Sequence, residues 1–218
     1  MNRPPRFAAF TLIEMITVIA IIVILTGLIL SINGLVQRKS ASARAAGEIQ
    51  QLSSACESYR NDNGGYPQDT SPQNVTNTLV PQLSTSPMTG SYAAASLFLY
   101  EALTGDVNAS GQIDSNETQR NYATDFFKPS RLGTMNGATV GTPGYVTYIQ
   151  DPFGNSYGYS TAGLANEQQY REALASPATA SSAQRQSNVG YNSTFDLWST
   201  GGTTGTSSTS TMNWIKNW

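Results

Sequence analysis

An apolar run of 21 residues near the N-terminus, Phe10 to Leu30, constrains this chain more than any other feature. About 20 apolar residues are enough for a helix to cross the hydrocarbon core of a membrane. The run contains one charged residue, Glu14, in what would be the first helical turn. We predict a transmembrane helix over residues 10–31, and we expect Glu14 to have a partner because a charge in hydrocarbon costs roughly 2.5–3.5 kcal/mol.

Residues 1–9 form a short basic leader with two arginines, no acid and a Pro-Pro pair that disfavours a helix. A secretory signal peptide would have a shorter apolar region, of about 7–15 residues, and a small-x-small cleavage site, which this chain lacks after Leu30. An uncleaved signal anchor is the other simple alternative. Basic residues flank the run on both sides, so the positive-inside rule does not settle the orientation, although a nine-residue leader is most easily left in the cytoplasm.

The run FTLIE at residues 10–14, placed after a basic leader and before an unbroken apolar helix, resembles the N-terminus of the prepilin family. The resemblance implies that a prepilin peptidase cuts between Ala9 and Phe10 and methylates the new N-terminus at Phe10. It also implies that Glu14, the fifth residue of the mature chain, guides each subunit into a helical filament. The family usually has glycine before the cut, and alanine is the small residue that stands there in this chain.

A cut before Phe10 would create an ammonium group one helical turn from Glu14, or beside the Glu14 of a neighbouring subunit. That ammonium is the partner we expect for the Glu14 carboxylate. The alternative interpretation of Glu14 is a charge at the level of the lipid headgroups, favoured there by the N-terminus of the helix.

The helix continues beyond the membrane segment, because no proline occurs between Phe10 and Tyr66. We predict one helix from Phe10 to about Asn61, with an amphipathic second half over residues 32–61, before the Gly-Gly pair and Pro67 stop it. Apolar residues recur there at steps of four and three on one face. They are Ala45, Ile49, Leu52, Cys56 and Tyr59. We interpret Cys56 on this face as a small buried hydrophobe.

Composition excludes several classes of active site. The chain has no histidine, which excludes Ser-His-Asp and Cys-His nucleophilic sites and every His-ligated zinc site. A single cysteine excludes an internal disulfide. The net charge of −2 gives no sign of nucleic-acid binding, and no pair of carboxylates stands out for catalysis. We expect no enzyme and no nucleic-acid partner.

Residues 62–218 are predicted to form a single head domain. β-Branched and aromatic runs with turn residues between them predict three strands, and other apolar runs predict two short helices. Residues 75–83 form a short element of ambiguous type. The fold class we predict is α+β, with the long helix packed on an antiparallel sheet of three or four strands. The predicted strands cover 145–149, 157–159 and 195–199, and the helices cover 93–103 and 164–176.

The segment 106–117 matches the twelve-residue EF-hand calcium loop at its diagnostic positions. Gly111 stands at position 6, where the sharp turn occurs, and Ile113 fills the apolar position 8. We predict a weak structural calcium site, with Tyr122 and Phe126 in a helix that leaves the loop. The alternative is a polar turn without metal. The predicted ligands are Asp106, Asn108, Ser110, the carbonyl of Gln112, Asp114 and Glu117.

Several C-terminal segments resemble the major pseudopilin of type II secretion. They are the end of the long helix at 59–67, Asp-Pro-Phe-Gly at 151–154, Tyr-Gly-Tyr at 157–159, Phe-Asp-Leu-Trp-Ser at 195–199 and the terminal Asn-Trp. In that family a loop after the Trp-Ser strand holds calcium through acidic side chains. Residues 201–212 contain no acid, so we do not expect that site in this chain.

Together these resemblances imply an exported structural subunit with a mature chain of residues 10–218. It would be held in the bacterial inner membrane by a single span, with its head in the periplasm, and would build a filament in the periplasm or at the cell surface. The implied partners are prepilin peptidase, further copies of the chain in a helical homopolymer, other pseudopilins and the inner-membrane assembly platform. The alternatives are a type IV pilin subunit for adhesion, motility or DNA uptake, and an uncleaved membrane-anchored calcium-binding module.

Overall fold

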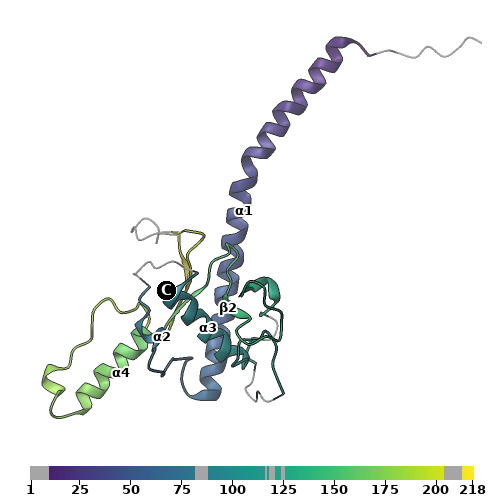
Figure 1. The fold of residues 1–218 in the computed structure, drawn as a ribbon. Coiled ribbons are helices and arrows are strands. Elements are labelled where there is room, and N and C mark those ends of the chain that lie inside the picture. The colour runs from purple at the N-terminus through teal and green to yellow at the C-terminus, as the bar shows by residue number, and fades with distance from the viewer. Residues whose placement is uncertain (1–9, 82–87, 116, 118–120, 124–125, 204–212) are drawn as a thin grey trace, which may run out of the picture. The chain divides into compact units, whose positions relative to one another are not determined.

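The fold is α+β, with a long N-terminal helix followed by short helices and antiparallel strands (Figure 1). We describe it from a computed structural model. The described residues are 10–81, 88–115, 117, 121–123, 126–203 and 213–218, and for 28–33 only the backbone is described. The chain divides into two compact units, Met1–Ser40 and Ala41–Trp218, which are treated separately below.

Helix α1 spans Leu12–Asn63, which confirms the predicted long helix. It ends where the sequence places consecutive glycines: Gly64 has a φ of +78° and donates its N–H to the Arg60 carbonyl at 2.8 Å. The predicted apolar face is also confirmed within the second unit. Ala45, Leu52 and Cys56 are fully buried, because their spacing places them on one side of the helix.

In the described part of the head, the strands form two small antiparallel sheets, whereas we predicted one sheet. β1 (Leu132–Thr134) pairs with β2 (Val146–Ile149). The other sheet has the order β3-β4-β5, with β3 at Gly158–Ser160, β4 at Asp196–Ser199 and β5 at Ile215–Lys216. Strands β2, β3 and β4 were predicted, whereas β1 and β5 were not.

Three further α-helices lie among the described residues of the second unit. α2 covers Val75–Thr78 within the segment of ambiguous type. α3 covers Gly90–Thr104, three residues longer at its start than predicted, and packs on β2 and β3. α4 covers Ala162–Ala175, close to the predicted 164–176. Two single-turn 3₁₀ segments lie at Pro129–Arg131 and Ala180–Ser182.

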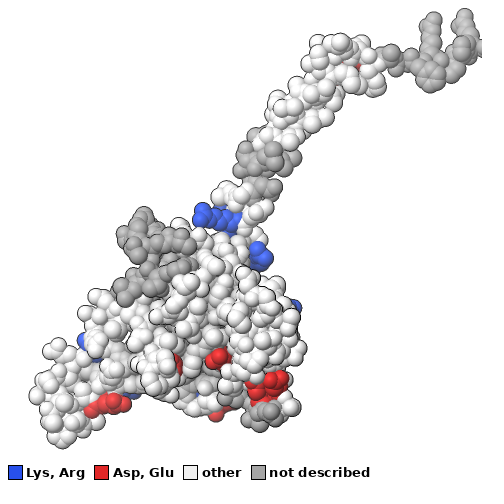
Figure 2. All heavy atoms as spheres, in the orientation of Figure 1, with Lys and Arg blue, Asp and Glu red and all other residues white. Residues whose placement is uncertain are grey.

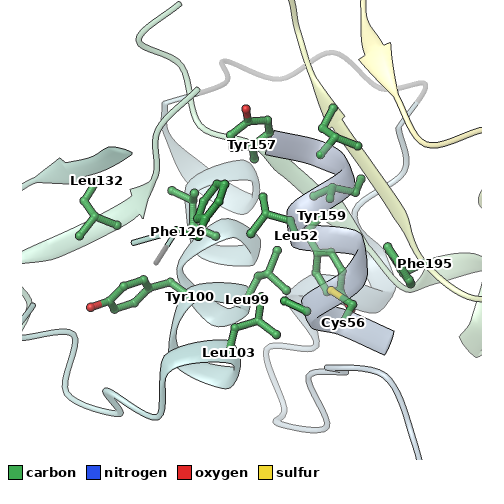
Figure 3. Close-up of a cluster of buried hydrophobic side chains, with 14 of the residues drawn as sticks. Leu52, Cys56, Leu99, Tyr100, Leu103, Phe126, Leu132, Tyr157, Tyr159 and Phe195 are labelled. Carbon is green, nitrogen blue, oxygen red and sulfur yellow. The ribbon is translucent and has the colours of Figure 1, made fainter. Parts of the chain in front are cut away.

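The core of the second unit lies between α1, α3 and the strands. Figure 3 shows Leu52 and Cys56 from α1 facing Leu99 and Leu103 from α3, with Tyr159 beside them. All five side chains are fully buried. Burial raises the pKa of the Cys56 thiol, in agreement with its interpretation as a buried hydrophobe. Four aromatic residues of the predicted strands, Tyr157, Tyr159, Phe195 and Trp198, are buried in the core.

Candidate functional site

The start of α1 brings the polar groups of the FTLIE run into contact. Thr11 immediately precedes the helix, and its hydroxyl accepts a 3.4 Å hydrogen bond from the N–H of Glu14. In return, Oε2 of Glu14 accepts bonds from the Thr11 N–H at 2.8 Å and the Thr11 hydroxyl at 2.7 Å. This reciprocal pattern is a capping box, which satisfies N–H groups that have no partner inside the helix.

The Glu14 carboxylate is thus satisfied by its own chain. We expected its partner to be the ammonium group that cleavage before Phe10 would create. Thr11 occupies that role in the structure, and it is a residue that our sequence reasoning missed. The Thr-x-x-Glu spacing of residues 11–14 is a recognisable signal for such a cap.

The predicted cleavage bond is described on one side only. Ala9 lies outside the described residues. Phe10 is 76% exposed, so the described side of this bond is open to a processing enzyme.

Apart from Glu14, the first part of α1, from Leu12 to Leu25, carries mostly apolar side chains, and they lie on every face of the helix. Each large apolar residue from Leu12 to Leu25 is between 49% and 78% exposed. A helix that is apolar all round is normally covered, either by protein or by lipid. Among the helices of the described residues, none offers a stretch that is both long enough and apolar enough to cross a membrane. The exposed apolar surface from Leu12 to Leu25 is the part of this unit that a partner would cover.

The second candidate site is the loop 106–117, which follows directly on the end of α3. Asp106, the first predicted ligand, is completely buried. Its Oδ1 accepts the N–H of Ser110 at 2.9 Å, and its Oδ2 accepts the N–H of Gly111 at 2.7 Å and the hydroxyl of Tyr100 at 2.7 Å. Gly111 has a φ of +78°, which suits the sharp turn expected at position 6 of such a loop.

The structure joins all six predicted ligands in one hydrogen-bonded network. The amide of Asn108 donates to Oδ2 of Asp114 at 3.0 Å, and the Ser110 hydroxyl donates to the Gln112 carbonyl at 2.9 Å. The Ser110 N–H also contacts Oδ1 of Asn108 at 3.0 Å. Glu117 accepts the N–H of Asp114 at 2.7 Å. The loop therefore gathers the oxygen donors, while its carboxylates are engaged by N–H groups.

Two observations bear on whether these residues fit a metal ion. Within the described part of the chain, no group of three or more His, Cys, Asp or Glu side chains is arranged so that it could hold one. The donors are nevertheless oxygens, which calcium prefers, and Asp106 has no ion pair with any described lysine or arginine. The donor chemistry fits calcium, whereas the carboxylates do not converge in this conformation, so the calcium site stays a prediction.

The helix expected to leave the loop is not present at the residues that can be checked. Tyr122 and Phe126 are not helical, and the N–H of Tyr122 instead donates to the Leu103 carbonyl at 2.8 Å. Residues 118–120 and 124–125 lie outside the described residues. The prediction of a leaving helix at Tyr122 and Phe126 was wrong, because Tyr122 closes back onto the end of α3 and Phe126 lies in a turn, where its N–H donates to the Ala123 carbonyl.

A further acid near the loop was not singled out from the sequence. Burial, followed by the nearby negative charge of Asp106, raises the pKa of the Glu101 carboxyl to about 7. Glu101 lies on α3, whose last turn leads into the loop. Its raised pKa reflects its burial first and its proximity to Asp106 second.

Comparison with known proteins gave a match to one family model. Residues 4–30 match the family model described as the prokaryotic N-terminal methylation motif. No curated protein and no solved structure matches the chain. The match covers the leader and the apolar part of α1, and it supports a type IV prepilin-like protein, a subunit that prepilin peptidase cleaves.

Proposed function

We propose that the chain is a structural subunit of a type II secretion pseudopilus. Prepilin peptidase would cut before Phe10 and methylate its new amino group, and the subunits would then assemble through their N-terminal helices to drive protein export. The observation that carries this proposal is the match of residues 4–30 to the methylation motif. Within this match, Glu14 lies in the first turn of a helix whose apolar side chains are exposed. The role is structural rather than catalytic.

The apolar side chains from Leu12 to Leu25 would be covered twice in the life of the subunit. Lipid of the bacterial inner membrane would cover them first, with the head in the periplasm. Helices of neighbouring subunits would cover them after extraction by the inner-membrane assembly platform. Other pseudopilins would join the same filament through equivalent helices.

Glu14 would change partners during this transfer. Before assembly its carboxylate is held by the N–H and hydroxyl of Thr11, which lowers the cost of keeping a charge near hydrocarbon. In the filament it would bind the ammonium of a neighbouring Phe10, and an ion pair in apolar surroundings is stronger than the same pair in water. This exchange would favour insertion of subunits at matching heights.

The choice of a pseudopilus over other filaments rests on the C-terminal segments. Asp151 of the Asp-Pro-Phe-Gly turn accepts the Ser199 hydroxyl of the Phe-Asp-Leu-Trp-Ser segment at 2.5 Å. Both residues are buried, and Asp151 also accepts the N–H groups of Phe153 and Asn155. The two segments that resemble the major pseudopilin thus form one packed unit, which supports the finer assignment.

A type IV pilin subunit for adhesion, motility or DNA uptake is the second candidate, because the methylation motif is common to both classes. Deletion of the gene distinguishes them. We expect the deletion strain to retain its secreted proteins inside the cell and to recover export with the wild-type gene but not with Glu14→Ala. Normal export together with lost motility would contradict the pseudopilus and favour the pilin. An uncleaved anchor would retain residues 1–9.

We also propose that the loop 106–117 binds calcium weakly and stabilises the head. The six predicted ligands belong to one hydrogen-bonded network. Movement of the Glu117 side chain away from the N–H groups of Val107 and Asp114 would free both its oxygens. Asp114 and Asn108, which are bonded to each other, lie at the exposed side of the loop. Calcium would neutralise the carboxylates of Asp106, Asp114 and Glu117 and would link these side chains through one ion.

Thermal unfolding of the full-length chain in detergent tests this calcium site. We expect the unfolding temperature to rise with millimolar calcium relative to EDTA, because 1 mM calcium at a weak site with a Kd of about 10⁻⁴ M adds about 1.4 kcal/mol. Glu117→Gln should abolish the rise, whereas Glu172→Gln on α4 should keep it. Identical unfolding of the wild type with calcium and with EDTA would rule out the site.

A further inference from the structure

The first charged residues that follow the apolar part of α1 are two adjacent cations, Arg38 and Lys39. Residues 15–37 contain no charged side chain, so the two cations end a long uncharged stretch of the helix. Both are exposed, and both belong to the first unit, Met1–Ser40. Figure 2 shows blue side chains on α1 where its uncharged part ends. This change from an uncharged to a basic surface indicates a boundary between two surroundings.

The length of the helix places this boundary at a defined level of a membrane. The step from Glu14 to Arg38 is about 36 Å along the axis of α1, at about 1.5 Å per residue. The hydrocarbon core of a bilayer is about 30 Å thick, and the core with both headgroup layers is about 40–45 Å thick. If α1 crosses the bilayer as proposed, Glu14 therefore lies in one headgroup layer and Arg38 lies in the other.

Two exposed apolar side chains lie within one helical turn before the cations. Leu35 is 61% exposed and Val36 is 55% exposed. Leu35 is on the same side of the helix as both cations, because it stands three residues before Arg38 and four before Lys39. Helical side chains lean toward the N-terminus of their helix, which here is toward the membrane. A lipid whose acyl chains rest on Leu35 can thus bring its phosphate to both cations.

The charges along α1 favour an anionic partner for this pair of cations. The nearest acid of the helix, Glu48, is about 14 Å from Lys39 along the axis, which exceeds the screening length of about 8 Å at physiological salt. Glu48 is also buried and bound by Tyr157 and Arg131. A zwitterionic lipid neutralises its own phosphate, whereas the phosphate of an anionic lipid keeps a net charge that the cations can bind.

The usual distribution of cations around a membrane span does not account for Arg38 and Lys39. Lysine and arginine are in excess in cytoplasmic loops. The proposed orientation instead places these two cations on the periplasmic side, where the head begins. An anionic headgroup at that level would give them a partner.

We propose that Arg38 and Lys39 bind the phosphate of an anionic phospholipid in the leaflet from which the head emerges. The inference rests on the proposed function, in which lipid covers α1 before assembly. Each lysine or arginine near a surface of anionic lipid strengthens binding about fivefold. The two cations together should therefore favour an anionic over a zwitterionic lipid by about 25-fold.

Native mass spectrometry of the chain purified from its host in detergent tests this preference. The protein is mixed with equal amounts of phosphatidylglycerol and phosphatidylcholine that have the same acyl chains. We expect phosphatidylglycerol adducts to exceed phosphatidylcholine adducts about 25-fold in the wild type, and about twofold or less in Arg38→Gln/Lys39→Gln. The control Lys128→Gln/Arg171→Gln removes the same charge from exposed positions of the head and should keep the wild-type preference.

Equal binding of the two lipids by the wild type, or the same loss in both double variants, would overturn the lipid site. Dimers that disappear in Arg38→Gln/Lys39→Gln, without any lipid preference, would assign the cations to a second copy and would also overturn it. The same spectra give the mass of the chain, so the two proposals can fail separately. A processed chain without a lipid preference leaves the proposed function standing, whereas a chain that retains residues 1–9 contradicts that function whichever lipid it binds.

Discussion

The hydroxyl of Tyr157 donates a 2.7 Å hydrogen bond to Oε2 of Glu48, which joins α1 to the residue just before β3. Glu48 is 8% exposed, and its Oε1 lies 3.3 Å from Nε of Arg131. Burial, followed by this bond to Glu48, raises the pKa of the Tyr157 hydroxyl. A buried carboxylate with one cation and one hydroxyl donor is costly to leave incomplete, so this contact ties the head to its helix.

Tyr157→Phe should therefore destabilise the chain by about 1.5–3 kcal/mol, the range for losing a hydrogen bond to a charged group. Urea unfolding followed by fluorescence measures the change. Tyr191→Phe is the matched control, because Tyr191 is 50% exposed, and it should change the free energy of unfolding by about 0.5 kcal/mol or less. If both variants lowered the free energy of unfolding by the same amount, the bond from Tyr157 to Glu48 would not contribute to stability as proposed.

Thr11→Val removes the hydroxyl that donates to Glu14 and should weaken the start of α1. Loss of a capping residue costs about 1 kcal/mol, so amide exchange in the first turn should accelerate about fivefold. Thr17→Val is the control, because the Thr17 hydroxyl bonds only the Ile13 carbonyl within the helix. Unchanged exchange at Met15 in Thr11→Val would contradict the capping role.

The sequence predicted the buried face of α1 and the end of this helix, because both depend on residues that are close together in the chain. The Ala45, Leu52 and Cys56 face and the stop at Gly64 are confirmed, because helical period and glycine conformation are properties of the chain itself. β5 was missed because it has only two residues and exists through pairing with β4, a distant segment.

The two candidate sites, the loop 106–117 and the start of α1, were also predicted only in part. The six loop residues lie in one hydrogen-bonded network, and the calcium site predicted from their spacing stays a prediction. The partner of Asp106 on α3, Tyr100, could not be read from the loop motif, because it depends on how α3 ends. The Thr11 cap, by contrast, depends only on the local Thr-x-x-Glu spacing, so the sequence alone is enough to predict it.

Glu101 should make stability depend on pH in a defined direction. Its folded pKa is about 7 against an ordinary value of 4.5, so between these pH values the folded chain binds more protons than the unfolded chain. Stability from this group is greatest below pH 4.5 and is lost as the pH rises through 7. Urea unfolding in EDTA at several pH values should show this fall in wild type and a smaller fall in Glu101→Gln. Identical profiles would contradict the raised pKa.

Gly158 on β3 is expected to be intolerant of a side chain. A Cβ atom at this position would overlap the ring of Trp198, which is fully buried on β4. Gly158→Ala should cost about 1–3 kcal/mol, because an overpacked core forces its neighbours to move. Gly65→Ala has open space around it and an ordinary φ, so thermal unfolding should detect little change there. A Gly158→Ala chain as stable as Gly65→Ala would show that the Trp198 ring has room to yield.

The intact mass of the protein purified from its host tests the central claim most directly. We predict a chain that has lost residues 1–9 and begins at Phe10 with one added methyl group. Glu14→Ala should show the same loss of residues 1–9 and the same added methyl group, because the substitution alters assembly rather than cleavage. A protein that retains Met1 to Ala9 would contradict the assignment as a processed filament subunit and leave a membrane-anchored module in its place.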